Sequence, residues 1–143
     1  MPPKRMNDAL LEEIADLLDE GFVVFVHRRT FESLSYPDAA RWGEMKSLDG
    51  YETVRGRLES EADAFVEVGS LPSKVSFDIM EDFALQLEDA RLRERLLSAL
   101  HSRKPFRYFR QAVEESPEAD AWLDFKRERI KAYALEVLAD KWD

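Results

Sequence analysis

The chain has 143 residues, of which 45% are hydrophobic and 36% are charged, and its 30 acidic residues outnumber its 21 lysines and arginines to give a net charge of −9. This length and composition predict one folded domain over residues 1–143 and exclude a disordered chain. The sequence has no cysteine, which excludes disulfides, thiolate metal sites and cysteine nucleophiles, and its negative charge argues against binding nucleic acid with the whole surface.

The N-terminal segment does not have the pattern of a targeting or membrane-spanning sequence. Residues 1–21 begin with basic side chains, but acids interrupt the apolar positions from Asp8 onward. The longest purely apolar run covers only 22–26, which is far too short to cross a bilayer. We therefore expect a cytoplasmic protein without a membrane segment.

The N-terminal half combines helix and strand patterns. Apolar residues at helical spacing predict a first helix that Asn7 caps and Gly21 ends. β-Branched and aromatic residues predict three strands, with a short amphipathic helix between the second and the third: strands 22–28, 30–36 and 63–70, and helix 49–61. Trp42 lies in a stretch without a clear period, and we expect it at the edge of the core.

The C-terminal half carries helix signals only. Ser76 is predicted to cap a helix that continues to residue 89, and leucines over 90–100 predict a second helix. Pro105 suits the first position of a third helix, and Ser116 with Pro117 marks the start of a last helix that ends near residue 141. Because strands precede helices, the predicted fold class is α+β: a small antiparallel or mixed sheet of about three short strands from the N-terminal half, packed with a C-terminal four-helix array.

Three segments of the C-terminal half form a recognisable combination. They read "IMEDFALQLED", "KPFRYFRQAVEESPEADAW" and "WLDFKRERIKAYALEVL". The positions that carry the pattern are Met80 to Phe83, then Phe106, Arg107, Phe109 and Arg110, then Trp122, Phe125 and Lys126. In these positions the chain resembles the bacterial uncharacterised protein family 0158, over roughly residues 71–140. The resemblance implies a fold and a compartment, and it implies no activity because the family has none established.

The segment "HSRKPFRYFR", residues 101–110, concentrates positive charge in an acidic chain. It holds four cationic and three aromatic side chains and no acid. We call the four cations the basic cluster, which consists of Arg103, Lys104, Arg107 and Arg110. Neighbouring guanidinium groups near the start of a helix are typical of a site for a phosphate, a nucleotide, single-stranded RNA or a partner's acidic segment. We therefore expect a non-enzymatic binding or regulatory module that holds an acidic partner or anion through this cluster.

Two alternatives for this segment stay open. In the first, the basic cluster acts with Tyr108, the ring least committed to the apolar stripe, in an accessory protein that binds RNA. In the second, Phe106 and Phe109 belong to the core, and the arginines pair with acids of neighbouring helices without any binding role. An exposed Tyr108 favours RNA, whereas arginines bound by intramolecular acids weaken every ligand hypothesis.

The aromatic residues of the last helix are expected mainly in the core. Trp122 and Phe125 are predicted to pack on Phe106 and Phe109 of the preceding helix. Trp142, near the end of the chain, is predicted to be peripheral.

Patterns for catalysis and metal binding are sparse. Five acids over 78–89 could supply paired carboxylates, although acids on a helix flank are usually solvated or bound to arginine. His27 and His101 are too far apart for a His-x-x-His metal site, and the sequence has no nucleophile elbow, Walker A motif or dinucleotide-binding glycine motif. We expect no catalytic residue, metal or cofactor. The remaining enzyme alternative is a hydrolase-like protein in which carboxylates of 78–89 face His101.

Overall fold

A computed structural model describes residues 6–38 and 50–142 of the chain, and Trp42 lies outside these residues. The chain divides into two compact units: a sheet unit of the residues up to Leu71 together with those from Ile130, and a helical unit from Pro72 to Arg129. The last helix contributes residues to both units. The expectation of one folding domain concerns the cooperativity of unfolding, and it stays a prediction.

The sheet unit begins with helix α1 (Asp8–Asp19), which Asn7 caps by accepting a hydrogen bond from the amide of Leu10 at 2.8 Å. Gly21, at φ 91°, then turns the chain into the first strand. The following elements are β1 (Phe22–His27), β2 (Ser33–Pro37), α3 (Tyr51–Ser60), the short 3₁₀ helix η1 (Ala62–Ala64) and β3 (Phe65–Gly69). The predicted first helix, three strands and intervening helix are therefore confirmed, but the second strand begins at Ser33 and not at residue 30, because residues 28–30 form the turn after β1.

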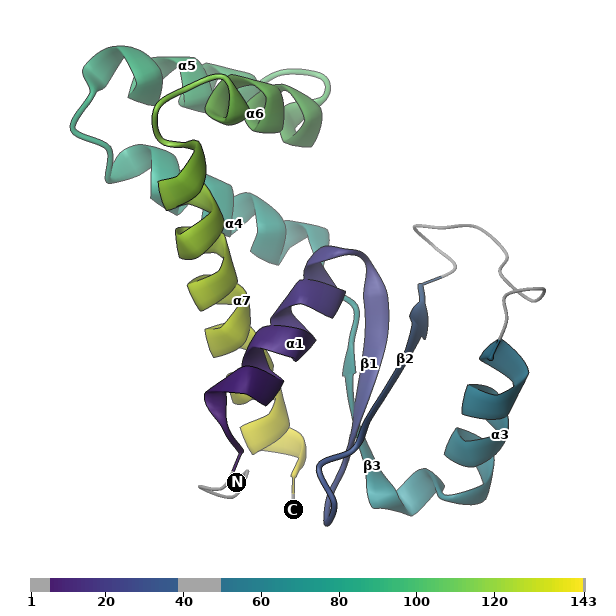
Figure 1. Cartoon of the computed structure of the whole chain (residues 1–143). Coiled ribbons are helices and arrows are strands. Elements are labelled where there is room, and N and C mark those ends of the chain that lie inside the picture. The colour runs from purple at the N-terminus through teal and green to yellow at the C-terminus, as the bar shows by residue number, and fades with distance from the viewer. Residues whose placement is uncertain (1–5, 39–49, 143) are drawn as a thin grey trace. The chain divides into compact units, whose positions relative to one another are not determined.

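The three strands form one sheet in the order β2-β1-β3, and both pairings are antiparallel. This result decides between the antiparallel and mixed sheets that the sequence allowed. Helix α1 packs against β1, and α3 lies beside β2 (Figure 1). Fully buried aliphatic side chains from α1, the strands and the last helix make the core of this unit: Ile14, Leu18, Val24, Val26, Val66, Ile130 and Leu138.

The C-terminal end of the last helix, α7 (Ala119–Lys141), contacts the loop between β1 and β2. We call this set of contacts, made by Arg28 and Phe31, the clamp. The Arg28 guanidinium donates hydrogen bonds to the carbonyls of Lys141 and Trp142, and Phe31 stacks on the Trp142 ring with a centroid separation of 5.9 Å. The final carbonyls of a helix have no hydrogen-bond donors within the helix. The Arg28 guanidinium supplies donors to these carbonyls. Because Trp142 is only 9% exposed, the prediction that it is peripheral is wrong.

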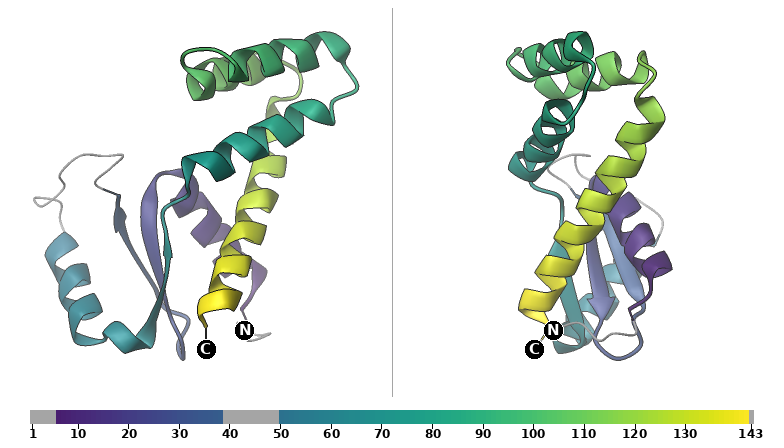
Figure 2. Two further views of the ribbon diagram at one scale, coloured as in Figure 1. Left: turned by 180° about the vertical axis from the view of Figure 1, so that it is seen from behind. Right: turned by 90° about the vertical axis from the view of Figure 1, so that its left-hand side faces the viewer.

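The helical unit contains three helices and the first part of α7. The three are α4 (Ser73–Leu85), α5 (Ala90–Leu100) and α6 (Pro105–Glu114). Helices α5 and α6 run side by side (Figure 2). The prediction that Ser76 caps α4 is wrong, because Pro72 occupies the N-cap position with extended backbone and its carbonyl accepts the amide of Ser76 at 3.1 Å. With helices concentrated in the C-terminal half, the α+β fold class is confirmed.

Aromatic rings make the core of the helical unit. Phe83 on α4, 1% exposed, meets Trp122 at 5.2 Å and Phe125 at 5.3 Å between ring centroids. Trp122 also meets Phe109 of α6 at 5.0 Å, so this predicted contact is confirmed. Phe125 packs on Phe83 of α4 instead of on α6, which corrects that part of the prediction. No helix in the described part of the chain is long and apolar enough to span a membrane.

Candidate functional site

Helix α6 presents the basic and aromatic segment at its N-terminal end. Pro105 is its first residue, as predicted, because the missing N–H and fixed φ of proline suit that position. Phe109 and Val113 are completely buried and anchor one side of the helix. Residues three, four and seven apart share a face, so Arg107, Gln111 and Glu114 lie together on the exposed side.

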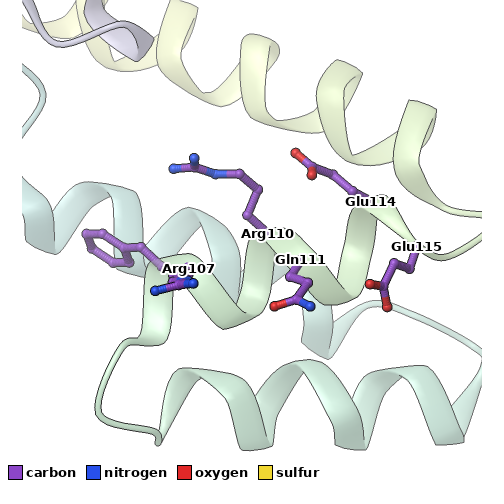
Figure 3. Close-up of a pocket in the computed structure, with 6 residues that line it drawn as sticks. Arg107, Arg110, Gln111, Glu114 and Glu115 are labelled. Carbon is purple, nitrogen blue, oxygen red and sulfur yellow. The ribbon is translucent and has the colours of Figure 1, made fainter.

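An open depression of about 660 Å³ follows this exposed side of α6 (Figure 3). Its lining residues are Phe106, Arg107, Arg110, Gln111, Glu114 and Glu115. Of the predicted site residues, the structure thus brings Arg107 and Arg110 into the depression, whereas Arg103, Lys104 and Tyr108 do not line it. Phe106, predicted to share the buried stripe with Phe109, is half-buried and lines the depression, because it lies at the edge of the stripe.

All four members of the basic cluster are exposed, and none forms a salt bridge or hydrogen bond through its side chain within the described residues. Several acids of the helical unit have other partners. Asp82 pairs with Arg129 at 2.8 Å, and Glu115 pairs with Arg95 at 3.1 Å. Asp89 accepts hydrogen bonds from two amides at the start of α5. Within the described part of the chain, the ion pairs required by a purely structural role of the cluster are therefore not formed.

The charges of α6 oppose its own dipole. Its first turn has no acid and its last turn no base, while Arg107 lies near the positive end and Glu114 is the last helical residue. Charges placed this way disfavour a helix, typically by about 0.3–1 kcal/mol each and toward the lower value when exposed. Helix α6 therefore relies on its buried stripe, and its surface charges do not contribute to its stability.

The start of α6 also leaves backbone donors without acceptors. Lys104 is the N-cap residue and has no side-chain oxygen that could accept a hydrogen bond. The amide of Tyr108 donates to the carbonyl of Lys104 at 3.0 Å, but those of Phe106 and Arg107 have no acceptor among the described residues. Together with the basic cluster, these donors make this end of the helix strongly electropositive.

The depression carries opposite charges at its two ends. In Figure 3 the Arg110 guanidinium extends toward the Arg107 end of the helix and away from Glu114. Glu115 is neutralised by Arg95, whereas Glu114 has no partner within the described residues. Both acids lie outside the predicted site, although the spacing of seven residues between Arg107 and Glu114 already indicates a shared face.

Tyr108 lies on the flank of α6 beside the basic cluster and is 44% exposed. Its ring is therefore available to a ligand, unlike that of Phe109. This exposure is the feature that favours stacking of a nucleic-acid base.

The two histidines make local backbone contacts. His101, exposed at the C-cap of α5, has its Nδ1 2.7 Å from the carbonyl oxygen of Leu97, to which it donates. His27 Nδ1 accepts hydrogen bonds from the amides of Arg29 at 3.0 Å and Thr30 at 3.2 Å, which shapes the loop after β1. The described residues therefore do not show the buried histidine and carboxylate required by the hydrolase-like alternative. Residues 6–38 and 50–142 also contain no group of three or more His, Asp or Glu arranged to hold a metal.

Perturbed pKa values in the sheet unit have structural causes. A hydrogen bond from Arg57, at 2.6 Å, lowers the pKa of the Glu32 carboxyl. Arg57 also pairs with Glu61 at 3.1 Å, and both carboxylates raise its own pKa. Burial raises the pKa of Tyr36. We infer that these ionisable groups stabilise the sheet.

Comparison with known proteins extends the resemblance of the C-terminal half to nearly the whole chain. A family model described as "Uncharacterised protein family (UPF0158)" matches residues 8–142. A curated UPF0158 protein of Pseudomonas aeruginosa is 33% identical over 84 residues, which make up 58% of this chain and 55% of that relative. The match thus spans little more than half the length of the relative. No solved structure matches the chain.

Proposed function

The chain belongs to the uncharacterised protein family UPF0158, and we propose that it is a non-enzymatic binding module that holds an acidic segment of a partner protein on the exposed side of α6. The basic cluster supplies the charge, and the half-buried Phe106 supplies apolar contact inside the depression. We place the module in the cytoplasm, in keeping with an acidic chain that has no cysteine.

The observation that carries this proposal is the absence of intramolecular partners for the basic cluster within the described residues. In a chain with a net charge of −9, acids are plentiful, and other arginines such as Arg57, Arg95 and Arg129 do pair with them. Four like charges gathered without a partner repel one another, and carboxylates from a second molecule would relieve this repulsion.

The shape of the depression favours a protein segment over a small molecule. Small-molecule sites are concave and bury most of the ligand surface. Here the lining comes from α6 and the residue that follows it, so a ligand would be covered on one side only. An extended or helical segment with several carboxylates can instead follow the helix and contact successive cations.

The test is the replacement of both arginines of the depression by alanine. Neither Arg107 nor Arg110 has an intramolecular side-chain partner in the described chain, so the double variant should fold normally. In fluorescence anisotropy we expect it to bind a labelled Asp- and Glu-rich peptide at least about tenfold more weakly than the parent. The control is Arg29→Ala with Arg91→Ala, which removes the same charge from exposed positions outside the depression.

Three results would contradict the proposal. The parent protein could fail to bind the acidic peptide, the double variant in α6 could bind it as tightly as the parent, or the control variant could lose the same affinity. The last result would show that binding of the acidic peptide depends on the net charge of the protein and not on a site on α6.

The exposure of Tyr108 favours a second candidate function, in which the same cations and this ring bind single-stranded RNA as a stacking platform. This candidate predicts that Tyr108→Ala weakens binding of an oligouridylate and leaves binding of the acidic peptide unchanged. We rank it second because Tyr108 does not line the depression that contains Arg107 and Arg110.

A further inference from the structure

We infer that Glu114 determines the specificity of the α6 surface. It makes the surface prefer protein segments that carry a positive side chain beyond their acidic residues over continuous polyanions such as RNA. This inference rests on the proposed function, since it concerns which acidic ligands the basic cluster accepts.

Glu114 is the unneutralised acid of the depression. It is exposed and has no hydrogen-bond or salt-bridge partner within the described residues. The neighbouring Glu115 is compensated by Arg95 at 3.1 Å. Arg110 precedes Glu114 by four residues, but this order of charges is the less favourable one for an ion pair within a helix. Figure 3 accordingly shows the Arg110 guanidinium directed away from the Glu114 carboxylate.

The spacing of the charges defines the ligand. From Arg107 to Glu114 the helix advances seven residues, which is about two turns or roughly 10 Å. A segment whose acids contact Arg107 and Arg110 therefore brings its next residues over Glu114. A lysine or arginine there forms an additional ion pair, whereas another carboxylate or phosphate is repelled. A single carboxylate can thus separate two classes of acidic ligand that the basic cluster alone would bind alike.

The experiment compares three labelled probes by anisotropy: a peptide with an acidic block followed by a lysine block, a peptide of the same length with acids throughout, and a single-stranded oligouridylate. The parent should bind the first peptide most tightly. Glu114→Gln should bind that peptide about threefold more weakly and the two polyanions about threefold more tightly, so the preference falls about tenfold. Glu136→Gln, at an exposed position on α7 outside the depression, makes the same charge change and should leave the preference unchanged.

The outcomes separate this inference from the proposed function. If the parent binds acidic peptides but Glu114→Gln keeps the same preference among the probes, the inference is wrong and the proposed function stands. Tighter binding of the oligouridylate than of either peptide by the parent overturns the inference and supports the RNA candidate. If the parent binds neither peptide, the proposed function itself fails.

Discussion

Replacement of Lys104 by aspartate should stabilise the protein and at the same time weaken the binding of an acidic peptide to the exposed side of α6. Lys104 is the N-cap residue of α6, and its side chain makes no capping hydrogen bond. The amides of Phe106 and Arg107 have no acceptor in the described chain. An aspartate at this position can accept from one of them, and its negative charge suits the positive end of the helix.

Two contributions set the size of the effect. A side-chain cap is worth typically about 1 kcal/mol, and an exposed charge that matches the helix dipole adds about 0.3 kcal/mol. The backbone of Lys104, at φ −130° and ψ 70°, is less extended than that of an ideal N-cap residue, which reduces the first contribution. We therefore expect Lys104→Asp to raise the free energy of unfolding by about 1 kcal/mol, or to raise Tm by about 3 °C.

Urea unfolding followed by circular dichroism at 222 nm measures this effect. Lys104→Ala removes the cation without adding a cap, and Lys104→Ser adds a cap without a charge. The expected order of stability is Asp above Ser above Ala. Binding of the acidic peptide should weaken about fivefold in the Asp variant. A Lys104→Asp protein less stable than Lys104→Ala would refute the reasoning, because it would show that the first turn of α6 has no donors available to a cap.

Three further predictions concern the units that support this surface. Phe109→Ala, which empties a fully buried position, should lower the free energy of unfolding by about 3–5 kcal/mol in urea titrations, whereas Tyr108→Ala at the neighbouring exposed position should change it by less than about 0.5 kcal/mol. Because Arg57 lowers the pKa of Glu32, this carboxylate takes up a proton less readily in the folded state than in the unfolded state. The ion pair therefore stabilises the folded state above pH 4.5, and this stabilisation is lost as the pH falls through the lowered pKa. Unfolding measured between pH 3 and 6 should therefore show a weaker pH dependence in Arg57→Gln than in the parent, and equal slopes would contradict this assignment. Arg28→Ala should speed amide hydrogen exchange in the last turn of α7, because it removes donors to the carbonyls there, and unchanged exchange would show that the clamp is not needed.

The fold could be predicted largely from the sequence because its elements begin and end at local signals. Asn7 caps α1, Gly21 at positive φ ends the turn after it, and Pro105 begins α6. The predicted start of α4 is wrong for a local reason as well. Ser73 and Ser76 are both suitable near the start of a helix, and the extended backbone of Pro72 places the cap before the first of them.

The site could be predicted only in part, because the pairing of its charges depends on tertiary neighbours. Helical spacing already separates the exposed Arg107 from the buried Phe109. It does not show that Arg95, twenty residues earlier in the chain, pairs with Glu115, whereas Glu114 has no partner among residues 6–38 and 50–142. The clamp depends even more on tertiary contacts, since its arginine and the carbonyl of Trp142 are separated by 114 positions.

The charge pattern of α6 is not one that selection for folding alone would produce, and it supports the proposed binding surface. Selection for stability alone would place acids in the first turn of a helix and bases in the last, and would pair exposed arginines with the abundant acids. Helix α6 has the opposite arrangement, and its basic cluster has no side-chain partner among the described residues. Folding of this region is secured by Phe109, Val113 and the ring of Trp122, so the exposed side can carry charges that do not help the fold. The exposed side of α6 departs from the rules for placing charges on a helix, whereas the buried side follows the rules for packing. Such a departure on one exposed surface is typical of a functional site.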